Sequence, residues 1–141
     1  MGNETIGSIV KSKGNDICSV APTATVFDAV SIMAKKGLAA VLVMRDGALI
    51  GIVSAKDYRR EVVLKGRSWK NVLVQEIMTT PVLTTTPDQN VGSGLAIMTR
   101  ESIRHLPVLA HGKVVGVVSM ADLACSLVSE QCSKGTGCKV M

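Results

Sequence analysis

The feature that most constrains the fold of this chain is an internal repeat. When the sequence is shifted by 65 residues, residues 20–58 align with residues 85–123 without a gap. Such self-similarity indicates that one supersecondary unit occurs more than once, and each unit is expected to pack against its copy. The identical pairs are Pro22/Pro87, Val26/Val91, Ile32/Ile97, Met33/Met98, Val43/Val108, Gly47/Gly112, Gly51/Gly116, Val53/Val118, Ser54/Ser119 and Asp57/Asp122.

The first half of each copy has the pattern of a short strand followed by a capped helix. The strands are expected at residues 17–20 and 82–85, each before a proline turn. Thr25 with Asp28 has the spacing of a capping box in the first copy, and Asn90 supplies the cap in the second. Apolar residues then recur with helical spacing in both copies. The two helices are therefore expected to begin just after Thr25 and Asn90.

The second half of each copy has the pattern of a β-hairpin followed by a helix. Aliphatic strands flank Asp46-Gly47 and His111-Gly112, and Asp-Gly favours a two-residue turn because both positions need positive φ. A further helix begins near Ser54 in the first copy and near Ser119 in the second. The sequence therefore predicts a mixed α/β (α+β) fold, in which two tandem β-α-β-β-α repeats pack with pseudo-two-fold symmetry. Expected boundaries are 1–66 for the first repeat with the N-terminal segment, 67–75 for a linker, 76–130 for the second repeat and 131–141 for a flexible tail.

Composition narrows the function classes. Hydrophobic residues make up 47% of the 141-residue chain and aromatic residues only 2%. The core is therefore expected to be aliphatic, without the stacked rings that bind single-stranded nucleic acid. Much of the net charge of +5 comes from cations between Lys56 and Lys70. This basic segment suits phosphate groups, an acidic partner or nucleic acid, and it is also the pattern of a solvated helix face.

The cysteines have the spacing of neither a disulfide framework nor a zinc site. The four are Cys18, Cys125, Cys132 and Cys138. A thiol-switched interaction through Cys132 and Cys138 remains an alternative function. No apolar run reaches the roughly 20 residues that span a bilayer, and the N-terminus lacks the shape of a signal peptide. We therefore expect a cytoplasmic protein that is not in a membrane.

The order of these motifs resembles the tandem pair of cystathionine-β-synthase-type (CBS) domains, also called a Bateman module. The most specific segments are Gly51-Ile-Val-Ser-Ala-Lys-Asp57 and Gly116-Val-Val-Ser-Met-Ala-Asp122, which share the form G-h-h-[S/T]-x-x-D. Residues 57–68 look especially like small stand-alone CBS-pair proteins. The resemblance spans residues 8–130 and includes further motifs at Glu76-Ile-Met78, Thr86-Pro-Asp88 and Ile103-Arg-His-Leu-Pro-Val108.

The resemblance implies two sites between the copies for an adenosine-containing ligand. The Asp of each motif would accept hydrogen bonds from the ribose hydroxyls, and the Ser would lie near the ribose or the first phosphate. Adenine would contact backbone groups of the other copy. The first implied site comprises Ser54, Asp57, Leu83, Ile103, Arg104 and His105. The second comprises Cys18, Leu38, Ala39, Val117, Ser119 and Asp122.

The two implied sites are expected to differ in charge. The first combines Asp57 with Arg104, so we expect it to prefer nucleotides. The second combines Asp122 with Leu38 and Ala39, which offer no charge to a phosphate, so we expect it to be empty or to favour uncharged adenosine. The alternative role for both aspartates is a favourable charge at a helix N-terminus. For His105 the alternative is a hydrogen-bonded structural residue.

The function implied by the resemblance is regulatory binding without catalysis. The ligand would be AMP, ADP, ATP, S-adenosylmethionine or an NAD-type molecule, and no cofactor is required. Binding would act on an unknown protein target through a change in conformation or in homodimer packing, which requires different ligand affinities in two states. The residues expected to form the homodimer surface are Val62, Val63, Leu127 and Val128. A nucleic-acid binder is the main alternative, and an enzyme is disfavoured because no nucleophile–base pair or metal cluster is visible.

Overall fold

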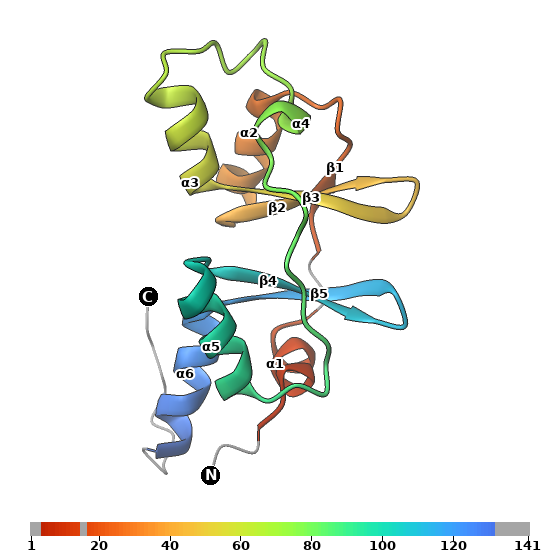
Figure 1. The fold of residues 1–141 in the computed structure, drawn as a ribbon, viewed down its shortest axis with the longest axis vertical. Coiled ribbons are helices and arrows are strands. Elements are labelled where there is room, and N and C mark those ends of the chain that lie inside the picture. Colours follow the sequence, from red (N-terminus) through yellow and green to blue (C-terminus); the bar gives the residue numbers. More distant parts are fainter. Residues whose placement is uncertain (1–3, 15–16, 132–141) are drawn as a thin grey trace. The chain divides into compact units, whose positions relative to one another are not determined.

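The computed structural model describes residues 4–14 and 17–131, with side chains described up to residue 128. The chain forms two compact units (Figure 1). Unit 2 is the continuous segment Ile17–Val82, and unit 1 combines Met1–Asp16 with Leu83–Met141. The sequence-based division grouped the N-terminal segment with the first repeat. In the structure this segment instead belongs to the unit that contains the second repeat.

Unit 2 is built on a three-stranded sheet in the order β1-β2-β3. Strand β1 pairs with β2 in parallel, and β2 pairs with β3 in an antiparallel hairpin. Figure 1 shows the helices of this unit on one face of the sheet. The elements are β1 (Ser19–Val20), α2 (Val26–Lys36), β2 (Ala40–Arg45), β3 (Ala48–Ser54), α3 (Ala55–Tyr58), the π-helical turn η1 (Arg59–Val63) and α4 (Val74–Ile77).

Unit 1 repeats this arrangement with one strand reduced to a single bridge. Strands β4 and β5 form an antiparallel hairpin, and Thr85 makes an isolated parallel bridge to Val108 where β1 lies in the other unit. The predicted mixed α/β fold with two repeats is confirmed. The elements of unit 1 are α1 (Ile6–Lys13), α5 (Val91–Glu101), β4 (His105–Ala110), β5 (Lys113–Ser119) and α6 (Met120–Gln131).

The caps and turns expected from the sequence are present. The Thr25 hydroxyl accepts a hydrogen bond from the Asp28 amide at 3.1 Å, and the Asn90 side chain accepts one from an amide of the first turn of α5. Both positions of each hairpin turn have positive φ, with values of 51° and 81° at Asp46-Gly47 and 54° and 78° at His111-Gly112. The local rules therefore determine where these elements begin and end.

Each unit has its own aliphatic core. In unit 2, Val26, Val43 and Val53 are fully buried between α2 and the sheet. Val62 is also buried, at 2% exposure, so its expected place on a dimer surface is wrong: η1 turns it into the core. Val63 remains exposed.

Two short helices that the sequence analysis did not predict complete these cores. In unit 1, α1 docks through backbone hydrogen bonds from Ile6 to Gln89 at 2.8 Å and from Gly7 to Pro87 at 2.9 Å. Its apolar face is buried, with Ile6 fully covered by α5 and α6. In unit 2, α4 docks in the same manner through a bond from Val74 to the carbonyl of the residue before Thr25.

Candidate functional site

The repeated Ser-x-x-Asp motif begins the second helix of each repeat. In α3 the Ser54 amide donates to Asp57 Oδ2 at 2.9 Å, and the Asp57 amide donates back to Ser54 Oγ at 3.3 Å. In α6 the corresponding distances between Ser119 and Asp122 are 2.8 Å and 3.0 Å. Both aspartates therefore act in reciprocal helix caps, so the expected alternative role at a helix N-terminus is present. A ligand role would come in addition to it.

Asp57 has no spare acceptor capacity in this structure. Its Oδ2 accepts from the amide and hydroxyl of Ser54, and its Oδ1 accepts from Arg60 Nη2 at 3.0 Å and Thr79 Oγ1 at 3.1 Å. A carboxylate offers about four acceptor sites, and all four are occupied. The residue is only 4% exposed. A ribose at Asp57 would therefore have to replace the bonds from Arg60 and Thr79.

Asp122 is more open and has a different partner. Its Oδ2 accepts from the Ser119 amide and from Lys13 Nζ, the latter at 2.6 Å. Its side chain keeps 27% of its surface exposed, and neither of these bonds uses Oδ1. Burial alone would raise the pKa of the Asp122 carboxyl, but the bonds from Lys13 and Ser119 outweigh it and lower the pKa. Asp122 is thus ionised with acceptor capacity in reserve.

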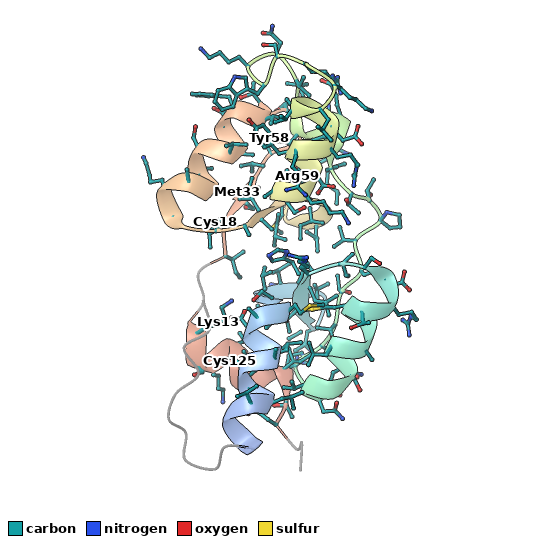
Figure 2. All side chains as sticks on the ribbon, turned by 90° about the vertical axis from the view of Figure 1, so that its left-hand side faces the viewer. Lys13, Cys18, Met33, Tyr58, Arg59 and Cys125 are labelled. Carbon is teal, nitrogen blue, oxygen red and sulfur yellow. The ribbon has the colours of Figure 1, made fainter. Side chains whose placement is uncertain are left out.

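Lys13 corrects the charge expected at the second implied site. The residues assigned to this site from the sequence are apolar, so no cation was expected beside Asp122. Lys13 of α1, which is labelled in Figure 2, donates from Nζ to the Asp122 carboxylate. No sequence pattern indicates this contact, because Lys13 is 109 residues from Asp122 and the helix that carries it was not predicted.

The glycine of each motif explains how these partners reach the carboxylates. A Cβ on Gly116 would lie 2.8 Å from Val10 Cγ1, so only glycine lets α1 approach β5 so closely. In unit 2 the side chain of Met78 lies on Gly51 in the same way. Lys13 is one helical turn beyond Val10, and Thr79 directly follows Met78. The Gly-to-Asp motif is therefore a docking surface as well as a helix start.

His105 and Arg104 lie in the same unit as Asp122. His105 begins β4 directly opposite Ser119 of β5. Burial lowers the pKa of the His105 imidazole; the Asp122 carboxylate opposes this effect, and Lys13 and Arg104 add to it. His105 is therefore neutral at pH 7. Arg104 is exposed, and its backbone carbonyl accepts a bond from the first amide of α6 at 2.8 Å.

The other predicted site residues divide between the two units. In unit 1, Leu83 is 44% exposed and Ile103 is half-buried. In unit 2, Cys18 and Leu38 are half-buried and Ala39 is exposed. Within unit 1 the structure brings together His105, Val117, Ser119 and Asp122. The grouping of residues from both repeats into one site stays a prediction.

The basic segment of unit 2 is largely neutralised by neighbouring carboxylates. Glu61 accepts from Arg60 at 3.0 Å and from Lys65 at 2.8 Å, and Arg67 pairs with Glu76 at 2.9 Å. The bonds from Lys65 and Arg60 lower the pKa of Glu61. These pairs reduce the number of cations available to a nucleic-acid backbone.

The three aromatic residues of the chain form one cluster in unit 2. The rings of Phe27 and Trp69 meet edge to face at 5.3 Å, and Tyr58 lies 6.3 Å from Trp69. The ammonium of Lys70 lies 5.8 Å from the Phe27 ring centroid. The position of Tyr58, next to Asp57 in α3, makes Trp69 a useful spectroscopic reporter for this unit (Figure 2).

Other functional features expected from the sequence have mixed outcomes. Cys125 of α6 is disulfide-bonded, so the expectation that the cysteines do not pair is wrong for this residue. Cys18 is a free thiol, and Cys132 and Cys138 lie outside the described residues.

Among residues 4–14 and 17–131, no helix has the length and apolar character needed to cross a membrane. In the same part of the chain, no cluster of three His, Cys, Asp or Glu side chains is placed to hold a metal ion.

Comparison with known proteins identifies two domains of one family in the chain. The family model of the CBS domain matches residues 7–64 and 74–129. The mitochondrial CBS domain-containing protein CBSX3 of Arabidopsis thaliana is 35% identical over 137 residues, covering 89% of this chain and 66% of that protein. The CBS domain-containing protein YhcV of Bacillus subtilis is 25% identical, covering 89% of each sequence. The chain thus spans about two thirds of the first relative and most of the second.

Solved structures agree with the sequence comparison. A protein with CBS domains from Burkholderia ambifaria matches with a TM-score of 0.86 and 41% identity, covering 90% of this chain and 96% of that one. A CBS-domain protein from Agrobacterium tumefaciens matches with a TM-score of 0.83 and 25% identity, covering 87% of this chain and 98% of that one. The likeness therefore extends over nearly the whole length of two small proteins.

Proposed function

The chain belongs to the family of CBS-domain proteins, and from this premise we propose that it is a regulatory module for an adenosine-containing ligand. Pairs of CBS domains are in general regulatory and bind ligands. The specific ligand proposed here is AMP, ADP, ATP, S-adenosylmethionine or an NAD-type molecule. The protein itself would catalyse no reaction and would need no cofactor.

The observation that carries this proposal is the state of Asp122. The carboxylate is ionised, held in position by its cap to Ser119, and retains exposed acceptor surface. A ribose presents two neighbouring hydroxyl donors, which suit a carboxylate with acceptor capacity in reserve. Hydrogen bonds to a charged group contribute about 1.5–3 kcal/mol each. Asp122 is therefore the better placed of the two motif aspartates to bind a ribose first.

The remaining site residues have supporting roles in the proposal. Val117 and Ser119 lie at the end of β5, just before Asp122 of α6. Cys18, Leu38 and Ala39 would contribute the adenine contacts from the first repeat. At the other motif, Ser54 and Asp57 would bind a second ligand with Leu83, Ile103, Arg104 and His105. That ligand would first have to displace Arg60 and Thr79 from Asp57.

Isothermal titration calorimetry with AMP, ADP, ATP, S-adenosylmethionine and NAD tests the proposal. At least one of these ligands should bind, and Asp122→Asn should weaken binding roughly 10- to 100-fold. Asp88→Asn is the matched control, because Asp88 is an exposed carboxylate of the same unit. If none of the five binds up to millimolar concentration, the proposed function is wrong.

We also propose that the protein acts as a homodimer in the cytoplasm on a protein target. Val63 and Val128 are 52% and 50% exposed, and Leu64 is 75% exposed, so aliphatic surface is available for pairing. A related solved structure is a hexameric CBS-CP12 protein, at 26% identity. Light scattering at micromolar concentration should give the mass of a dimer, and a monomer mass would contradict this part of the proposal.

Nucleic-acid binding remains the second candidate because Arg59 and Lys56 are exposed cations of unit 2. Its signature would be affinity for DNA or RNA that falls steeply as salt is raised. We expect only weak binding of this kind, since Arg60, Lys65 and Arg67 are already paired with carboxylates.

A further inference from the structure

The Asp122 site contains a cation that lies outside the repeat carrying the motif. Lys13, the last residue of α1, donates from Nζ to Asp122 Oδ2 at 2.6 Å and to the Val117 carbonyl at 3.0 Å. The contact of Val10 with Gly116 fixes α1 at this point of β5. The position of Lys13 near the end of β5 is therefore fixed by the packing of α1 as well as by its bond to Asp122.

Lys13 and Asp122 together offer both a donor and an acceptor to a ligand. An ammonium group has three N–H donors, and the two bonds above use two of them. The Lys13 side chain is 42% exposed, so its third donor can face solvent or a ligand. The bonds from Lys13 and the Ser119 amide both go to Oδ2, and the Asp122 side chain keeps 27% of its surface exposed, so the carboxylate can accept from a ligand beside Lys13. A hydroxyl next to an anionic group matches this pair of groups.

The surrounding charges strengthen the preference for an anion. His105 is neutral because burial lowers its pKa, so it neither adds to nor cancels the charge. Arg104 is exposed and close enough to influence the titration of His105. Lys13 is the cation that bonds directly to the Asp122 carboxylate, and Arg104 acts in the same direction as Lys13 on the pKa of His105. The cations near His105 and Asp122 therefore favour an anionic ligand group.

Unit 2 has no equivalent arrangement. The residue that reaches Asp57 from the segment docked on Gly51 is Thr79, which is uncharged. The cation at Asp57 is Arg60, from the same helical segment, and it bonds to Glu61 as well. The two motifs therefore differ in the charge that the docked segment supplies.

We propose that Lys13 is a specificity-determining residue, which makes the Asp122 site prefer a ligand with a phosphate next to its ribose over uncharged adenosine. This inference rests on the proposed function, since it requires that an adenosine moiety binds at Asp122. It reverses the expectation from the sequence, in which the Asp122 site was the one without affinity for phosphate.

Calorimetry with AMP and adenosine tests the inference on wild type, Lys13→Met and Lys11→Met. Lys11 is the matched control, because it is an exposed lysine of the same helix. Wild type should bind AMP more tightly than adenosine, and Lys13→Met should reduce this preference roughly 10-fold or more. Lys11→Met should leave the preference within about 3-fold, because salt screens a distant charge. Lys13→Arg should retain most of it.

Two further measurements separate the inference from a general loss of folding or binding. In an Asp122→Asn background, Lys13→Met should change the preference by less than it does in wild type, because Asp122 holds the Lys13 ammonium and the effects of residues in contact are not additive. In wild type, the affinity for AMP should fall with salt more than the affinity for adenosine does, and this test needs no variant.

Several outcomes would overturn the inference. One is an equal affinity of wild type for AMP and adenosine. Another is an unchanged preference for AMP in Lys13→Met. A third is loss of this preference in Arg104→Ala while Lys13→Met retains it. If wild type binds neither compound nor any other adenosine derivative, the proposed function itself fails. Thermal melting of each variant verifies that α1 remains docked.

Discussion

Replacing Asp57 by Asn should destabilise the protein far more than the same change at an exposed cap. Each oxygen of the buried Asp57 carboxylate accepts from two donors. Asn has one acceptor oxygen, so either the two Ser54 donors or the pair from Arg60 and Thr79 would face an NH2 group. Two lost bonds to a buried charged group correspond to about 3–6 kcal/mol. For a chain of this length that is a fall in Tm on the order of 9–24 °C.

The control is Asp28→Asn, because Asp28 occupies the same third position of a helical capping box but is exposed. Loss of this cap should cost about 0.5–1 kcal/mol, and Asp122→Asn should fall between the two. Differential scanning calorimetry of the three variants at neutral pH gives the comparison. If Asp57→Asn melts within about 3 °C of Asp28→Asn, the filled carboxylate contributes no more than an ordinary cap, and the reasoning is wrong.

Two other predictions concern packing and pH. Gly94→Ala should lower the free energy of unfolding by about 1–2 kcal/mol, because the new Cβ would lie 2.8 Å from a buried Leu123 methyl. Gly92 is on the same helix, and a Cβ there would meet only a 3.5 Å contact. Gly92→Ala should therefore raise the free energy of unfolding by up to about 1 kcal/mol. Burial lowers the pKa of His105 in the folded state. The neutral imidazole therefore contributes its full stability above the unfolded-state pKa of about 6.5. This contribution is lost as the pH falls through the lower folded-state pKa. Melting curves recorded from about pH 7.5 to pH 5 should therefore show a fall in Tm that His105→Gln reduces and His111→Asn, at an exposed turn, does not.

The parts of the fold that depend on local chemistry could be predicted from the sequence. The duplicated spacing identified the two repeats, Thr25 and Asn90 marked the helix starts, and Asp46-Gly47 marked a hairpin turn. In each case the residues that determine the structure are adjacent or a few positions apart. The Ser54 and Ser119 caps follow the same rule, and the sequence analysis placed the start of both helices correctly.

The candidate site depends on contacts that no local pattern encodes. The bond between Lys13 and Asp122 requires that α1 docks on a strand more than a hundred residues away. Helix α1 can dock there because Gly116 has no side chain. In the sequence, however, Gly116 is recognisable only as part of a family motif. The difference between Asp57 and Asp122 in their capacity to accept hydrogen bonds from a ligand could not be predicted either. The two motifs are identical at the Ser and Asp positions. Arg60 is the exception, since its spacing from Asp57 is that of neighbours on a helix.

The docking of α1 in unit 1 has a consequence for the order of folding during synthesis. Unit 2 is one continuous segment, so all of it has been synthesised before β4 and β5 are made. The apolar face of α1, with Ile6 and Val10, emerges first but finds its partners only when α6 has been translated. Domains generally fold as units as they emerge, and contacts between distant segments form late. The nascent chain therefore carries the apolar residues of α1 without their packing partners until α6 is made, and the Asp122 site is assembled last.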